Sequence, residues 1–91
     1  MTDHARLTAV ERVQTGVRLE KRTLKVLKAL ADLKDMTLGD LIEGLALHAF
    51  DGQLPFDERT REQIRALKRA FQLDLDASSS HRLTEGDSRD A

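Results

Sequence analysis

The sequence has no cysteine, no tryptophan and no tyrosine, and it contains one proline and three phenylalanines among 91 residues. Without cysteine, neither a disulfide framework nor a thiolate metal site is available. No stretch approaches the ~20 consecutive apolar residues that a membrane helix needs. Residues 1–13 also lack the basic and apolar regions of a secretory signal. These absences predict a soluble protein of a reducing cytoplasm.

Neither sign of charge prevails over the whole chain, because 15 Lys and Arg side chains face 16 Asp and Glu side chains, for a net charge of −1. The charges are nevertheless grouped along the sequence. Residues 12–34 hold seven basic and two acidic side chains, whereas residues 74–91 hold two basic and five acidic ones. An acidic tail can conceal a basic binding face in the whole-chain sum, so nucleic-acid binding is not excluded. The alternative is a solvated helix face that carries ordinary lysines.

The residue types that perform catalysis or bind metals are not clustered. The three histidines are dispersed, no Gly-rich phosphate loop occurs, and no Ser/His/Asp arrangement can be argued. His48 lies among apolar neighbours, with no second histidine or paired carboxylate spaced to join it, which favours a packed side chain over a metal ligand. We therefore predict no enzyme, no metal and no cofactor.

Residues 12–19 alternate between apolar and polar side chains, which is typical of a half-buried strand. One face carries Val13, Thr15, Val17 and Leu19. The other face carries Arg12, Gln14, Gly16 and Arg18. A single strand has no partner within its own chain, so this pattern predicts that a second copy lies beside it.

Helical spacing follows the alternating segment. Apolar residues recur every three or four positions over residues 20–34 and again over 38–50. Thr37 with Asp40 three residues later fits the capping-box pattern and predicts where the second helix begins. A third amphipathic helix is predicted within residues 57–73.

Composition divides the chain into four parts. Residues 1–11 are predicted to form a flexible arm, residues 12–50 the main domain, residues 51–73 a linker and the third helix, and residues 74–91 a disordered acidic tail. So short a chain buries only a modest core alone, which favours an obligate oligomer.

Several motifs accompany the order of one strand and two helices. Val-Arg-Leu closes the strand, Leu27-x-x-Leu30-Ala31 lies in the first helix, and Leu41-Ile42-x-x-Leu45 lies in the second, which Thr37 opens. In these features residues 12–50 resemble the ribbon-helix-helix family, the superfamily of the Arc and methionine repressors. The resemblance implies a mainly α fold with one short β-strand, in which two chains pair their strands into an intermolecular antiparallel ribbon, with an additional C-terminal helix. The expected dimer core is Val13, Thr15, Val17, Leu19, Leu27, Leu30, Leu41, Ile42 and Leu45.

The same resemblance implies a transcriptional repressor that inserts its ribbon into the major groove of double-stranded DNA. The positions that match the base-reading residues of the family are Gln14, Gly16 and Arg18. Arginine and glutamine suit this role because they bond guanine and adenine edges, whereas glycine departs from the pattern because it has no side chain. The expected phosphate contacts are Arg12, Lys21, Arg22, Thr37, Leu38 and Gly39, the last three at a helix N-terminus.

Two alternatives remain open. In the first alternative, the chain is an antitoxin whose residues 57–73 and tail bind a toxin. In the second it is a dimeric scaffold without DNA binding, as Gly16 and the net negative charge suggest.

Overall fold

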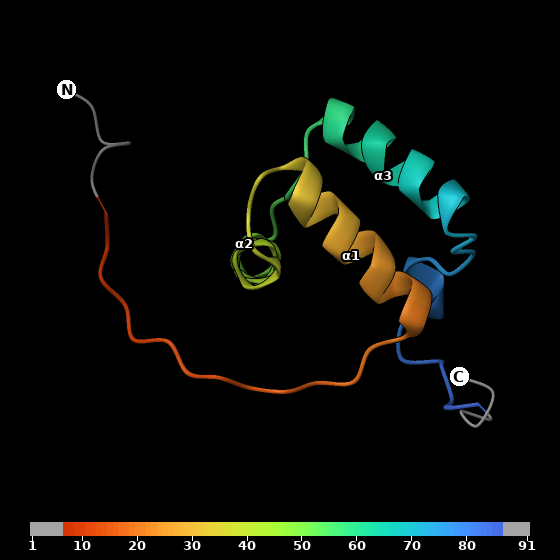
Figure 1. Ribbon diagram of the computed structural model, residues 1–91, viewed down its shortest axis with the longest axis horizontal. Coiled ribbons are helices and arrows are strands. Elements are labelled where there is room, and N and C mark those ends of the chain that lie inside the picture. Colours follow the sequence, from red (N-terminus) through yellow and green to blue (C-terminus); the bar gives the residue numbers. More distant parts are fainter. Residues whose placement is uncertain (1–6, 87–91) are drawn as a thin grey trace.

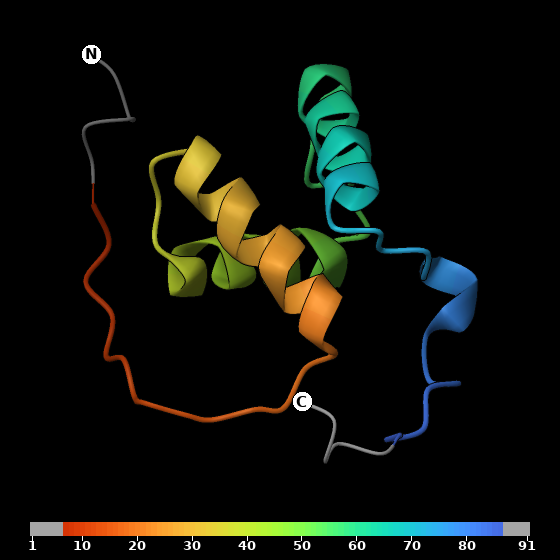
Figure 2. The same ribbon diagram turned by 45° about the vertical axis from the view of Figure 1, so that its right-hand side comes forward.

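The computed structural model describes residues 7–86, which form three α-helices and one short 3₁₀ helix (Figure 1). The helices are α1 (Lys21–Leu33), α2 (Leu38–Phe50) and α3 (Glu58–Ala70), and the 3₁₀ helix is η2 (Ala77–Ser79). Residues 7–20 precede α1 as an extended segment that runs outside the helices (Figures 1 and 2). Residues 1–6 of the predicted arm and residues 87–91 of the predicted tail lie outside the described residues.

The prediction of one short β-strand and an intermolecular two-stranded ribbon is wrong. Residues 7–86 form no β-strand, so the fold is all-α rather than ribbon-helix-helix. A strand exists only where backbone hydrogen bonds join it to a second segment, and within the described part of the chain none joins residues 7–19 to another segment. Val13 is 81% exposed and Val17 is 71% exposed, so the apolar face of the alternation faces solvent. Alternation in the sequence therefore did not produce a sheet.

The three helices expected from the apolar spacing are confirmed, Thr37 begins the second as predicted, and Asp57 caps the third. The Thr37 hydroxyl accepts from the Asp40 amide at 3.0 Å at the start of α2. The Asp57 carboxylate accepts from the Thr60 amide at 2.9 Å at the start of α3. Asp35 takes a φ of 56° in the turn after α1, a left-handed conformation that aspartate tolerates. No helix in residues 7–86 is long and apolar enough to cross a membrane.

The core is small and centres on α1, which contacts both α2 and α3. Leu30, Ala31 and Leu41 are buried, and five half-buried side chains pack against them: Leu27, Leu45, Phe56, Ile64 and Leu67. Four of the nine residues expected in a dimer core thus pack within a single chain: Leu27, Leu30, Leu41 and Leu45. The other five are exposed: Val13, Thr15, Val17, Leu19 and Ile42.

Helices α1 and α3 pack side by side in opposite directions (Figures 1 and 2). At one end, Arg22 in the first turn of α1 donates to the carbonyl of Gln72, just beyond α3, at 2.9 Å. At the other end, Lys34 after α1 donates to the Thr60 hydroxyl in the first turn of α3 at 2.6 Å. The start of α1 therefore lies beside the end of α3.

Candidate nucleic-acid interface

This antiparallel packing brings cations from separate parts of the sequence to one end of the helix pair. Lys21 and Arg22 open α1, Lys68 and Arg69 lie in the last turn of α3, and Arg18 lies just before α1. We call these five residues the basic end. Side chains of this type bind the phosphates of nucleic acids, so the basic end is the candidate interface.

Glu20 caps α1 and orients the Arg22 side chain of the basic end. Its carboxylate accepts from the backbone amides of Arg22 at 3.1 Å and Thr23 at 2.8 Å, which caps α1. It also accepts from Arg22 Nε at 3.0 Å, so the same carboxylate orients the guanidinium. Partial burial would raise the pKa of Glu20, but the hydrogen bonds from Thr23 and Arg22 outweigh it and lower that pKa from its ordinary 4.5 to about 2. Glu20 is therefore ionised at neutral pH and holds Arg22 in place.

Acidic residues of the C-terminal segment contact the basic end. Arg22 Nη1 lies 3.0 Å from Asp74 Oδ1, and Arg18 pairs with Glu85. Hydrogen bonds from Ser78 are the main cause that lowers the pKa of Asp76, and the nearby charge of Lys68 lowers it further. Two carboxylates, Asp74 and Glu85, thus pair with two cations of the basic end, Arg22 and Arg18.

The predicted base-reading residues Gln14, Gly16 and Arg18 lie on the extended segment, and all three are exposed. A Cβ added at Gly16 would meet no atom within 4 Å, so close packing does not explain the glycine. Arg12, a predicted phosphate contact, is held on α2 by Glu43 through two hydrogen bonds of 3.0 and 3.1 Å. These bonds raise the pKa of Arg12 and lower the pKa of Glu43.

The other predicted phosphate contacts fall into two separate groups. Lys21 and Arg22 belong to the basic end, whereas Thr37, Leu38 and Gly39 follow the turn at the opposite end of α1. A helix of 13 residues is about 20 Å long. Thr37 already caps α2 through the Asp40 amide, and the Asp40 carboxylate lies in the same turn. The chain therefore does not bring the two groups together.

No family model, curated protein or solved structure matches this chain.

The resemblance to the ribbon-helix-helix family thus rests on the motifs of residues 12–50, and it concerns sequence rather than the observed fold.

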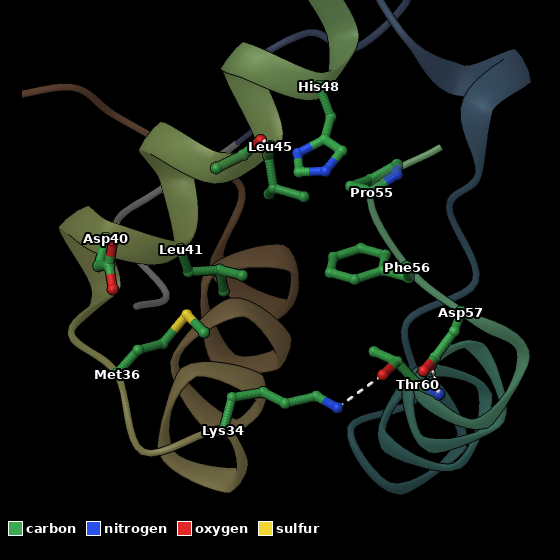
Figure 3. A pocket seen from close by; sticks show the side chains of 11 residues that line it. Lys34, Met36, Asp40, Leu41, Leu45, His48, Pro55, Phe56, Asp57 and Thr60 are labelled. Carbon is green, nitrogen blue, oxygen red and sulfur yellow. Dashed lines mark hydrogen bonds between the residues drawn. The ribbon is translucent and has the colours of Figure 1, made fainter. Parts of the chain in front are cut away.

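A cavity lies between α2 and the start of α3 (Figure 3). This cavity of about 350 Å³ has an apolar wall that includes Leu41, Leu45 and Phe56. At one side, the Lys34 ammonium donates to the hydroxyl of Thr60, which is buried. Hydrogen bonds from Thr60 also lower the pKa of Asp57. Because these polar groups already bond to one another, the cavity suits packing better than chemistry.

Sequence reasoning missed the acidic partners of the basic end. Glu20 carries no recognisable capping signal in the sequence, because glutamate is not among the preferred capping residues. Asp74 and Glu85 were assigned to a tail without contacts. The opposite charges of residues 12–34 and 74–91 were visible in the sequence, but charge alone does not reveal which acid meets which base.

Proposed function

We propose that this chain is a cytoplasmic, homodimeric DNA-binding protein that acts as a transcriptional repressor. The observation that carries the proposal is the basic end, where two antiparallel helices bring together four cations beside Arg18 of the extended segment. Each cation that neutralises a phosphate releases a condensed counterion, which favours binding without any contact to a base.

We assign recognition of the DNA sequence to the extended segment, which acts as a single arm and not as part of a β-ribbon. Gln14 and Arg18 are exposed on this segment, which continues directly into the basic end. Extended arms enter a groove of DNA as single segments and read it with arginine or glutamine side chains. Phosphate contacts at the basic end would then position the arm.

The proposal of a homodimer rests on the apolar surface of the chain. Val13 and Val17 of the extended segment and Phe50 at the end of α2 are exposed, Phe50 by 81%. Burial of a side chain of this size contributes about 1.5–3 kcal/mol. A second copy that covers these residues would also double the number of basic ends.

Salt dependence tests the proposal. Binding to a fluorescent duplex of about 30 base pairs should weaken steeply between about 50 and 200 mM salt, as phosphate contacts require. Lys21→Ala should weaken binding to all sequences and make the salt slope shallower by about 1. The matched control is Arg59→Ala, an exposed cation in the first turn of α3 at the opposite end of the helix pair. If no duplex binds at the lowest salt, the proposal fails.

One observation favours a dimeric scaffold as the second candidate. Three arginines expected to contact DNA are paired with carboxylates of the same chain: Arg12 with Glu43, Arg18 with Glu85, and Arg22 with Asp74. A scaffold would remain a dimer in sedimentation and would bind no duplex at low salt.

The antitoxin alternative has less support. That alternative requires the apolar stripe of residues 57–73 to be free to bind a toxin. In the structure, Ile64 and Leu67 of that stripe pack against the core of their own chain.

A further inference from the structure

After α3 the chain passes the start of α1, where Gln72 and Asp74 contact Arg22 (Figures 1 and 2). We call residues 72–86 the acidic strap, because this segment carries Asp74, Asp76 and Glu85 against a single arginine, Arg82. The turn begins at Gln72, whose φ of 56° is left-handed. The strap therefore starts at the basic end itself.

Polar contacts connect the strap to the basic end along its length. Arg22 Nη1 donates to the Gln72 carbonyl at 2.9 Å and to Asp74 Oδ1 at 3.0 Å. Further along, Asp76 lies within the electrostatic reach of Lys68, and Glu85 pairs with Arg18. Asp74 and Glu85 thus pair with two different cations of the basic end.

Apolar side chains accompany these ion pairs. Leu75 and Leu83 of the strap line a groove together with Leu19, which lies just before α1. Leu75 is half-buried, whereas Asp74 and Glu85 remain exposed. Leu83 is 54% exposed, so of these two leucines it is Leu75 that seats the strap on the molecule while its charges face the basic end.

We propose that the acidic strap is an intramolecular competitor of nucleic acid at the basic end. This inference rests on the proposed function, since it concerns regulation of the same site. A carboxylate and a phosphate cannot both pair with the same nitrogen atoms of Arg22, because each anion needs the same N–H donors. DNA must displace Asp74 before it binds Arg22 through Nη1, and it competes with Glu85 for Arg18 at Nη2.

The exposure of the ion pairs sets how strongly the strap competes. The side chains of Arg18 and Asp74 are 82% and 81% exposed, and an exposed ion pair changes an equilibrium only about 1.5- to 5-fold. The two ion pairs, Arg18 with Glu85 and Arg22 with Asp74, together change it about 2- to 25-fold. The strap thus weakens binding without abolishing it, and a polyanion that contacts several cations at once displaces it best.

Charge removal in the full chain tests the inference. The strap variant carries Asp74→Asn, Asp76→Asn and Glu85→Gln, and asparagine at position 76 keeps an oxygen that can cap η2. We expect this variant to bind a duplex on the order of tenfold more tightly than the wild type.

The matched control carries Asp32→Asn, Asp35→Asn and Asp51→Asn. It changes the net charge by the same amount with exposed residues near the ends of α1 and α2, remote from the basic end. Interactions over the roughly 20 Å length of α1 are screened beyond a Debye length of about 8 Å. The control should therefore bind the duplex like the wild type.

A second measurement follows the strap directly. The chain has no cysteine, so Thr84→Cys accepts a single spin label on the strap. In the free protein the label should broaden the amide signals of residues 18–22, and the duplex should remove that broadening. A label at Gln53→Cys, after α2, should leave these signals unchanged in both states.

The outcomes separate this inference from the proposed function. If the strap variant binds the duplex no more tightly than the control variant, DNA binding stands and the competitor is refuted. Broadening that persists unchanged in the DNA-bound protein refutes it as well. If none of the three proteins binds a duplex at low salt, DNA binding and the competitor fail together.

Discussion

At the scale of single residues, Glu20 links the fold to the candidate interface. Its carboxylate receives four hydrogen bonds, from the amides of Arg22 and Thr23, from Arg22 Nε and from the Thr23 hydroxyl. One side chain therefore caps α1 and aims a cation of the basic end. If the carboxylate is removed or protonated, α1 loses its cap and Arg22 loses the partner of its Nε, although its Nη1 keeps Gln72 and Asp74.

Replacement of Glu20 by alanine should lower the free energy of unfolding by about 1–2 kcal/mol at neutral pH, as loss of a charged cap does. The pKa of Glu20 in the folded protein is about 2, below its ordinary 4.5. The stabilisation is therefore complete above about pH 5 and is lost as the pH falls toward 2. Urea unfolding followed by circular dichroism should show the difference between wild type and variant shrinking over that range. Glu62→Ala, an exposed carboxylate on α3, is the control, and a difference independent of pH would contradict the assignment.

At the scale of secondary structure, α3 is part of the core rather than an addition to it. Ile64 and Leu67 pack on the buried cluster of Leu30, Ala31 and Leu41. Lys34 and Thr60 join α1 to α3 at one end, and Arg22 and Gln72 join them at the other. The three helices should therefore unfold as one unit.

The substitution Ile64→Ala tests whether the three helices unfold cooperatively. Truncation of a half-buried isoleucine should lower the free energy of unfolding by about 1–3 kcal/mol, below the cost at a fully buried site. We expect a single transition in urea, in which α1 and α2 unfold together with α3. Arg65→Ala, on the exposed side of the same helix, should change stability by less than about 0.5 kcal/mol. A two-step transition would show that α3 folds separately.

The elements that sequence reasoning recovered are those with local signals. The spacing of leucines and the caps Thr37 and Asp57 determine α2 and α3 within a few residues of chain. The predicted strand failed because a sheet needs a second segment, and alternation in residues 12–19 does not supply one. The ion pair of Arg22 and Asp74 could not be predicted from the sequence, because it joins residues 52 positions apart. Charged residues show no periodic pattern that would identify the partner of each. The roles of Gln14 and Arg18 stay predictions.

At the scale of the whole molecule, the chain leaves much of its apolar surface uncovered. Only four hydrophobic side chains are buried among the described residues, Val26, Leu30, Ala31 and Leu41. Large apolar side chains are exposed on the extended segment and on α2, as they are at an interface between subunits. This imbalance motivates the homodimer.

If a second copy covers this surface, the melting temperature should rise with protein concentration, because association stabilises the folded state by mass action. Phe50→Glu places a charge on the exposed end of α2 and should shift the sedimentation profile from dimer to monomer. Gln53→Glu adds the same charge three residues later at an exposed polar position and should leave the dimer intact. A wild-type chain that sediments as a folded monomer at micromolar concentration would refute the dimer.

The antiparallel pairing of α1 with α3 also determines the order in which the chain assembles. Helices α1 and α2 are joined by a short turn, so they meet after closure of a small loop, whereas Arg22 and Gln72 are 50 residues apart. Closure of the longer loop costs more entropy and makes this contact slower to form. During synthesis Lys68 and Arg69, which complete the basic end, also emerge well after Arg18, Lys21 and Arg22. The candidate interface is therefore a late product of folding, and a partly folded chain presents its cations scattered rather than gathered.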